Sequence, residues 1–139
     1  MEKIEPIRKL IKEAAKSIDQ PKQVAASLPL TRVQVHAIDF LSNQPDCQVN
    51  QHQFEQEMGV QRSTITVMLQ RLEKKGLVTR LPDPADKRQK LVALTPAGKD
   101  LVPKLKEVII DDDLQLKHQF TEDELAATRK VLMYIKQEG

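Results

Sequence analysis

The chain has 139 residues, enough for one domain with a hydrophobic core, and its 40% apolar and 30% charged residues are typical of a globular protein. No apolar run approaches the roughly 20 residues that span a bilayer, and the charged N-terminus lacks the apolar segment of a signal peptide. The single cysteine, Cys47, excludes an internal disulfide and fits a reducing compartment. We therefore expect a cytoplasmic protein with no membrane partner.

The N-terminal part of the chain is predicted to be helical. Residues 4–18 carry apolar side chains at steps of three and four, which indicates an amphipathic helix. Thr31 and Gln34 have the spacing of a capping box and predict the start of a second helix, which Pro45 ends. The apolar positions of the first helix are Ile4, Ile7, Leu10, Ile11, Ala14 and Ile18.

The next two predicted helices have the spacing of a helix-turn-helix. Asn50 caps a short helix that ends at Gly59, and a further helix is expected over residues 61–76. In a helix-turn-helix the second helix enters the major groove of DNA. Its exposed face is rich in Arg, Gln, Ser and Thr, which hydrogen-bond base edges and phosphates. The opposite, buried face is formed by Ile65, Leu69 and Leu72.

Two short strands are predicted at residues 77–81 and 90–94, joined by a loop too long for a tight hairpin. A two-stranded ribbon directly after a recognition helix is called a wing. The loop of this ribbon carries Lys87 and Arg88, where DNA phosphates would lie. Asp86 is close enough in sequence to orient the Arg88 guanidinium through a charge-assisted hydrogen bond.

The C-terminal part is again helical by pattern. Thr95 and Pro96 have the capping and first-turn chemistry that opens a long helix, in which Pro103 is expected to cause a kink. A second capping box, Thr121 to Glu124, predicts the start of the last helix. The residues of that helix expected to face inward are Leu125, Leu132 and Ile135.

The distribution of charge favours an anionic partner. The net charge is only +2, but residues 61–90 contain eight Lys or Arg and three acidic residues. The remaining residues are acidic on balance. A solvated surface is the simpler explanation of a charge run. The coincidence of this one with a predicted recognition helix and wing favours nucleic acid.

Residues 28–102 resemble the MarR family of bacterial transcriptional regulators. The motif RLEKKGLVTR at residues 71–80, the Asp-x-Arg of residues 86–88 and LTPAG at residues 94–98 carry the resemblance. It implies a mainly α fold with a two- or three-stranded antiparallel wing and helices that form a homodimer. It also implies a regulator, with repressor as the expected role, that binds a pseudo-palindromic operator in double-stranded DNA. Release by a small-molecule effector or an oxidant is a further implication.

The resemblance also implies an organisation of the chain. Residues 1–139 would form one domain of this type, with a DNA-binding lobe at 30–95. The helical regions 1–20 and 96–139 would form the dimer, through apolar stripes that the small lobe cannot cover. The expected dimer residues are Ile4, Ile7, Leu10, Ile11, Ile18, Leu125, Leu132 and Ile135.

The expected DNA contacts follow from the same resemblance. On the recognition helix they are Arg62, Ser63, Thr64, Thr66, Val67, Gln70 and Arg71, and on the wing they are Asp86, Lys87, Arg88 and Lys90. Val67 departs from the Arg or Asn that is usual in the family, which suggests an apolar contact such as one with a thymine methyl. Gln61 replaces the usual Ser or Asp cap and is expected to weaken the helix start.

Three alternatives accompany this interpretation. Cys47 could sense oxidants, but no basic residue lies near it in sequence to stabilise a thiolate. His36 and His118, the latter after Asp111 to Asp113, could bind zinc, although the sequence lacks clustered histidines. The fold could instead bind a protein and not DNA. We find no motif of an enzyme and expect no cofactor.

Overall fold

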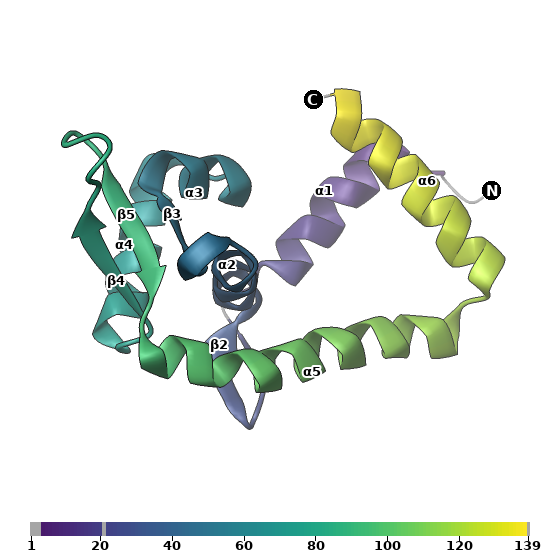
Figure 1. Ribbon diagram of the computed structural model, residues 1–139. Coiled ribbons are helices and arrows are strands. Elements are labelled where there is room, and N and C mark those ends of the chain that lie inside the picture. Colours follow the sequence, from purple (N-terminus) through teal and green to yellow (C-terminus); the bar gives the residue numbers. More distant parts are fainter. Residues whose placement is uncertain (1–3, 21, 139) are drawn as a thin grey trace. The chain divides into compact units, whose positions relative to one another are not determined.

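The computed structural model describes residues 4–20 and 22–138 and divides the chain into two compact units (Figure 1). The first unit ends at Leu105 and the second begins at Lys106. The fold is mainly helical with two small antiparallel sheets, which confirms the predicted fold class. The functional division into a lobe at 30–95 and flanking dimer regions stays a prediction.

Helix α1 spans Ile7–Ile18 and begins later than predicted. Pro6 occupies the cap position with an extended backbone, φ −58° and ψ 139°, so the helix starts only after it. Ile4 therefore precedes the helix and is 93% exposed. The prediction of a helix from residue 4 is therefore wrong. Proline has no backbone N–H group, so it is favoured at the start of a helix, where that group would have no partner within the helix.

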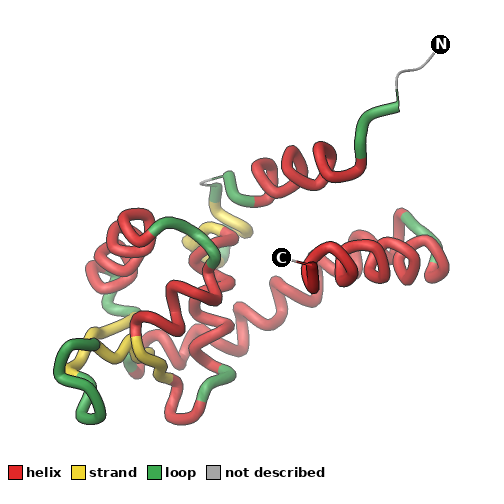
Figure 2. Tube along the Cα trace, turned by 90° about the horizontal axis from the view of Figure 1, so that it is seen from above, coloured by secondary structure: helices red, strands yellow, loops and turns green. Residues whose placement is uncertain are grey.

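A hairpin that was not predicted from the sequence follows α1. It consists of β1, Gln23–Ala25, and β2, Leu28–Thr31, which pair antiparallel (Figure 2). Leu28 and Leu30 are fully buried, while Pro29 between them is exposed. This alternation has the period of two that a strand with one buried face requires.

The capping box at the start of α2, Arg32–Ser42, is confirmed. The Gln34 N–H donates to Thr31 Oγ1 at 3.2 Å, and the Thr31 N–H donates to Gln34 Oε1 at 3.0 Å. These two bonds satisfy two backbone donors that a helix start would otherwise leave without partners.

The helix-turn-helix consists of α3, Gln51–Met58, and α4, Arg62–Lys74. The Asn50 side chain accepts a hydrogen bond from the Gln53 N–H at 2.8 Å, as predicted. Gly59 ends α3 with φ +65°, a conformation that glycine adopts at little cost. Gln61 occupies the cap position of α4 and makes no side-chain cap hydrogen bond, so the weak helix start expected from it stays a prediction.

The second sheet has the strand order β3-β5-β4 and is antiparallel throughout. Strand β3 is Gln48–Asn50, directly after the short 3-10 helix η1, Pro45–Cys47. Strands β4, Val78–Pro82, and β5, Lys90–Leu94, are the two predicted wing strands, whereas β3 was not predicted as a strand.

The core of the first unit lies between the helix-turn-helix, α2 and this sheet. Each large apolar side chain that becomes fully buried contributes about 1.5–3 kcal/mol. All three residues predicted for the inner face of α4 are fully buried. The fully buried side chains include Ile38, Leu41, Phe54, Ile65, Leu69, Leu72 and Val92. This packing fixes α4 and therefore determines which of its residues face outward.

Helix α5, Pro96–Gln119, starts at the predicted cap and continues through Pro103. Thr95 Oγ1 accepts from the Gly98 N–H at 3.1 Å and donates to the Gly76 carbonyl at 2.6 Å. The threonine thus joins the end of the recognition helix to the start of α5. Gly98 is buried against the backbone of Leu77.

Replacing Gly98 by alanine is expected to destabilise the first unit by about 1–3 kcal/mol. The added Cβ would overlap the Leu77 carbonyl oxygen and lie 3.2 Å from its carbon, and backbone atoms yield less easily than side chains. This clash should outweigh the roughly 1 kcal/mol that alanine gains in helix propensity. Denaturant unfolding would measure the difference, with Lys99→Ala as an exposed control. A Gly98→Ala variant as stable as wild type would contradict this assignment.

The second unit contains the rest of α5 and helix α6, Glu122–Glu138. The predicted capping box is confirmed, since the Thr121 N–H donates to Glu124 Oε1 at 3.0 Å and the Glu124 N–H donates to Thr121 Oγ1 at 3.1 Å. The hydrogen bond from the Thr121 backbone, followed by that from its hydroxyl, lowers the pKa of Glu124.

Candidate nucleic-acid interface

The outward face of α4 carries the side chains predicted to read DNA. Arg62, Ser63, Thr64, Gln70 and Arg71 are exposed, as is Val67 at 45%, and Thr66 is half-buried. The Thr66 hydroxyl donates to the Arg62 carbonyl at 3.0 Å and keeps its lone pairs free to accept. The helix therefore presents donors and acceptors around one apolar contact at Val67.

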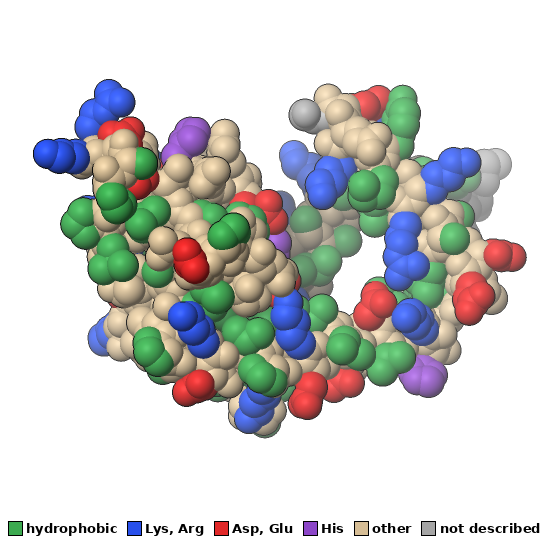
Figure 3. Space-filling model, in the orientation of Figure 1, with side chains coloured by type: hydrophobic (Ala, Val, Ile, Leu, Met, Phe, Trp, Pro, Cys, Tyr) green, Lys and Arg blue, Asp and Glu red, His purple; other side chains and the backbone are tan. Residues whose placement is uncertain are grey.

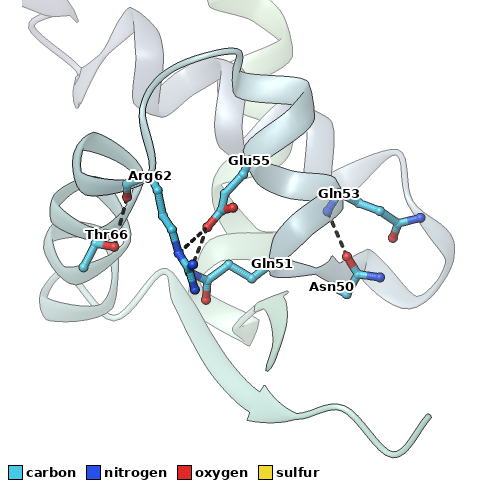
Figure 4. Close-up of polar contacts among 6 residues, drawn as sticks. All are labelled: Asn50, Gln51, Gln53, Glu55, Arg62 and Thr66. Carbon is cyan, nitrogen blue, oxygen red and sulfur yellow. Dashed lines mark hydrogen bonds and ion pairs between the residues drawn. The ribbon is translucent and has the colours of Figure 1, made fainter. Parts of the chain in front are cut away.

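Arg62 is positioned by a residue that was not predicted from the sequence (Figure 4). Its Nε lies 3.7 Å from Glu55 Oε1, and Gln51 Nε2 donates to the same oxygen at 3.3 Å. Glu55 is on α3, one turn before the helix ends, so the pair links the two helices of the motif. Because Arg62 is largely exposed, the ion pair contributes little stability and mainly restricts where the guanidinium lies.

The wing loop, residues 83–89, is a turn held together by hydrogen bonds between its own residues (Figure 1). Asp83 is buried, and its Oδ1 accepts from the Ala85 N–H at 2.9 Å. The Asp83 N–H donates to the Gln89 carbonyl at 3.2 Å, which closes the loop at its base. Such aspartate turns stabilise a compact backbone where strands separate. The role of Asp83 was not predicted.

The predicted pairing of Asp86 with Arg88 is confirmed. Asp86 Oδ1 accepts from the Arg88 N–H at 3.0 Å and from its Nε at 3.3 Å. The Arg88 side chain is otherwise 90% exposed. Figure 3 shows basic side chains protruding at the end of the first unit where the wing loop lies. The carboxylate thus directs an exposed guanidinium without burying it.

A cavity of about 280 Å³, the wing pocket, brings part of the predicted site together. Its lining includes three predicted residues, Arg62, Arg88 and Lys90. The lining residues that the sequence did not single out are Gln51, His52, Glu55, Arg80 and Gln89. The pocket is therefore strongly cationic, with Glu55 as its one carboxylate among the described residues. Asp86, Lys87 and the rest of the α4 face lie outside it.

Arg80 differs from the other arginines of the wing pocket because its side chain is only 23% exposed, against 83% for Arg62 and 90% for Arg88. Its Nη2 lies 2.9 Å from Glu73 Oε1, and both side chains are mostly buried. This ion pair links strand β4 to the recognition helix. Arg80 therefore supports the pocket wall and leaves Arg62, Arg88 and Lys90 as the cations available to a ligand.

The residues predicted for a dimer lie in both units. On α1, Ile7, Leu10 and Ile18 are exposed and Ile11 is half-buried. On α6, Leu132 is exposed, whereas Leu125 and Ile135 are half-buried. Further exposed apolar side chains of the second unit are Ile109, Ile110, Leu114, Leu116, Phe120, Val131, Met133 and Tyr134. So much exposed apolar surface on helices is typical of an interface.

The candidate zinc and redox residues are far less organised. His36 Nε2 lies 3.5 Å from Glu57 Oε1, while His118 belongs to the second unit. Asp113, in the acidic run, lies 3.6 Å from Lys117 Nζ and 3.7 Å from Arg129 Nη2. Cys47 is half-buried and its thiol donates weakly to the Ser42 carbonyl at 3.9 Å.

Among residues 4–20 and 22–138, no group of three or more His, Cys, Asp or Glu side chains is placed to hold a metal ion. In the same part of the chain, no helix is long and apolar enough to cross a membrane.

Solved structures of DNA-bound regulators resemble this fold. A mutant MarR from E. coli complexed with operator DNA matches with a TM-score of 0.77 and 27% identity, over 94% of this chain and 93% of that chain. The S. aureus MepR–DNA complex matches with a TM-score of 0.82 and 21% identity, over 98% and 100% of the two chains. The second likeness shows the fold alone, because the identity is low.

Sequence comparison gives the same family. The uncharacterized HTH-type transcriptional regulator YsmB of Bacillus subtilis is 28% identical over 142 residues, covering 99% of this chain and 94% of that protein. Residues 28–89 match the MarR family. Fold and sequence define a winged helix-turn-helix transcriptional regulator, not an enzyme. The match to the MarR family of these regulators covers residues 28–89, and the likeness to E. coli MarR covers 94% of the chain.

Proposed function

We propose that this chain binds a pseudo-palindromic operator in double-stranded DNA as a homodimer and represses transcription. Helix α4 enters the major groove and the Arg88 guanidinium reaches towards the minor groove. The observation that carries the proposal is the wing pocket, in which Arg62, Arg88 and Lys90 converge beside the recognition helix. Such convergent cations suit the phosphate backbone, which dominates the affinity of proteins for DNA.

The proposed homodimer is supported by the structure's exposed apolar residues, whereas the proposed effector is supported only by the family resemblance. Exposed apolar residues on α1, α5 and α6 favour a second copy of the chain as the partner of these helices. Repression and release by a small molecule rest on the family alone. A protein-binding module is the second candidate function, but its recognition surface would not need cations on both the helix and the wing.

Selection of bound sequences from a pool of random duplexes tests the proposal. We expect an enriched motif with two symmetric half-sites, centred about one helical turn or a multiple of it apart. Recovery of unenriched sequences at low salt would show binding without sequence recognition. No recovery at any salt concentration would favour the protein-binding alternative.

Replacing Gln70 by alanine is expected to reduce the preference at one base pair in each half-site. Gln70 is exposed near the centre of the outward face of α4, and a glutamine can contact adenine through two hydrogen bonds. Such a contact contributes about 1–3 kcal/mol of discrimination. The selection repeated with Gln70→Ala measures the effect, with Arg71→Ala as the comparison from the edge of the face. An unchanged motif would assign base recognition to Arg62, Thr66 and Val67 instead.

A further inference from the structure

A second cavity lies at the opposite end of α4 from the wing pocket. It has a volume of about 460 Å³ and lies between the end of α4, the start of α2 and the β1–β2 hairpin, and we call it the hairpin pocket. Arg71, Lys74 and Lys75 line it, and its described lining contains no acidic residue. The cavity is therefore cationic and, unlike the wing pocket, holds no carboxylate to compete with an anion.

One polar side chain in this wall is buried and lacks a partner for its donor group. Gln34 lines the pocket and is only 8% exposed. Its Oε1 accepts from the Thr31 N–H at 3.0 Å, which leaves the Nε2 group as donor. Among residues 4–20 and 22–138, the structure gives Nε2 no acceptor. The Nε2 group is not among the fully buried polar atoms without a partner, so it reaches the solvent of the pocket and can donate to an acceptor that binds there.

The cations of the hairpin pocket are also available. Lys75 Nζ donates to the Pro29 carbonyl at 2.7 Å, which holds the ammonium group at the hairpin and leaves two of its protons free. Arg71 and Lys74 are exposed, and the described part of the chain offers neither of them an ion pair. Two exposed cations, one fixed cation and an amide donor surround the same space.

We propose that the hairpin pocket binds a phosphate of the DNA backbone, so that α4 is flanked by an anion site at each end. This inference rests on the proposed DNA binding and adds a second contact to it. Arg62 and Arg71 are nine residues apart on one helix, or about 14 Å along its axis. That length is comparable to the roughly 12 Å width of the major groove, whose two edges carry phosphates.

The substitution Gln34→Glu tests the site with little change of shape. Glutamate keeps the Oε1 acceptor of the capping box but replaces the NH₂ donor by a charged oxygen, which repels phosphate and attracts the lysines. With two pockets per dimer, we expect binding to weaken about tenfold and the salt slope to fall by about two units. The effect should be equal for the selected operator and a random-sequence duplex, because phosphates carry no sequence information.

Gln115→Glu, an exposed change of the same charge in the second unit, is the control. Equal affinity and slope for Gln34→Glu and this control would overturn the inference. If Gln34→Glu does not fold, as judged by circular dichroism, Lys74→Gln is measured in its place. We expect the same weakening of DNA binding, and an affinity and salt slope equal to those of the control would overturn the inference. If wild type itself binds no duplex, the proposed function fails as well, so the two failures are distinguishable.

Discussion

The Leu10→Asp variant is expected to be monomeric and to bind a two-half-site operator at least about 100-fold more weakly than wild type. Leu10 is 46% exposed on the apolar face of α1, where the proposed dimer would bury it. A carboxylate there would be stripped of its hydration on association. A monomer also forgoes the gain of about 10²–10⁴ that comes from linking two binding lobes.

Sedimentation and operator binding together measure this effect. Lys16→Gln on the polar side of α1 changes the net charge equally and should remain dimeric. A monomeric wild type at micromolar concentration, with mass near 15.8 kDa, would contradict the dimer proposal directly. A dimeric Leu10→Asp variant would remove α1 from the interface.

The Arg88→Ala variant is expected to bind all duplexes roughly 10- to 100-fold more weakly, with a salt slope smaller by about one unit for each phosphate that Arg88 neutralises. The Arg88 guanidinium is exposed at the wing loop and already oriented, so its removal should not affect folding. Binding measured at two salt concentrations, with Lys136→Ala as control, tests the prediction. Wild-type affinity and slope would refute the proposed role of the wing.

Asp86 is expected to act through Arg88. Asp86→Asn should keep part of the turn and weaken the charged hydrogen bond at 3.3 Å that orients the guanidinium. We expect a smaller decrease of affinity than for Arg88→Ala, and no additional decrease when the two substitutions are combined. Additive effects in the double variant would show that Asp86 contributes by another route.

Local signals in the sequence were sufficient to predict the recognition motif. The Thr31–Gln34 box, the Asn50 cap and the Gly59 stop each depend on residues within four positions of one another. The inner face of α4 followed from helical periodicity. These features needed no knowledge of distant parts of the chain, which is why the structure confirms them.

Of the strands that were not predicted, β3 depends on a distant partner, whereas β1 and β2 pair with each other locally. Strand β3 has three residues, and Val49 pairs with Val92 more than forty positions later. A three-residue segment is too short to show alternation. The β1–β2 hairpin is similarly short, and without it the hairpin pocket could not be foreseen.

The sequence also predicted the positions of the basic residues better than the acidic residues that pair with them. The basic run at residues 61–90 was visible, but the partners of two of its members were not. Glu55 reaches Arg62 from α3, and Glu73 reaches Arg80 across α4 and β4. Only the tertiary fold shows which cations support the wall of the wing pocket and which are exposed to a ligand.

The most direct test of DNA binding is the binding constant for a duplex measured as a function of salt concentration. A regulator that places two cationic lobes on DNA should show a steep linear fall of log K with log salt, with a slope near −0.9 for each phosphate contacted. We predict such a slope, with a magnitude of several units, for both the selected operator and random-sequence duplexes. Binding that is absent, or that hardly changes with salt, would contradict the central claim that this face of the molecule binds DNA.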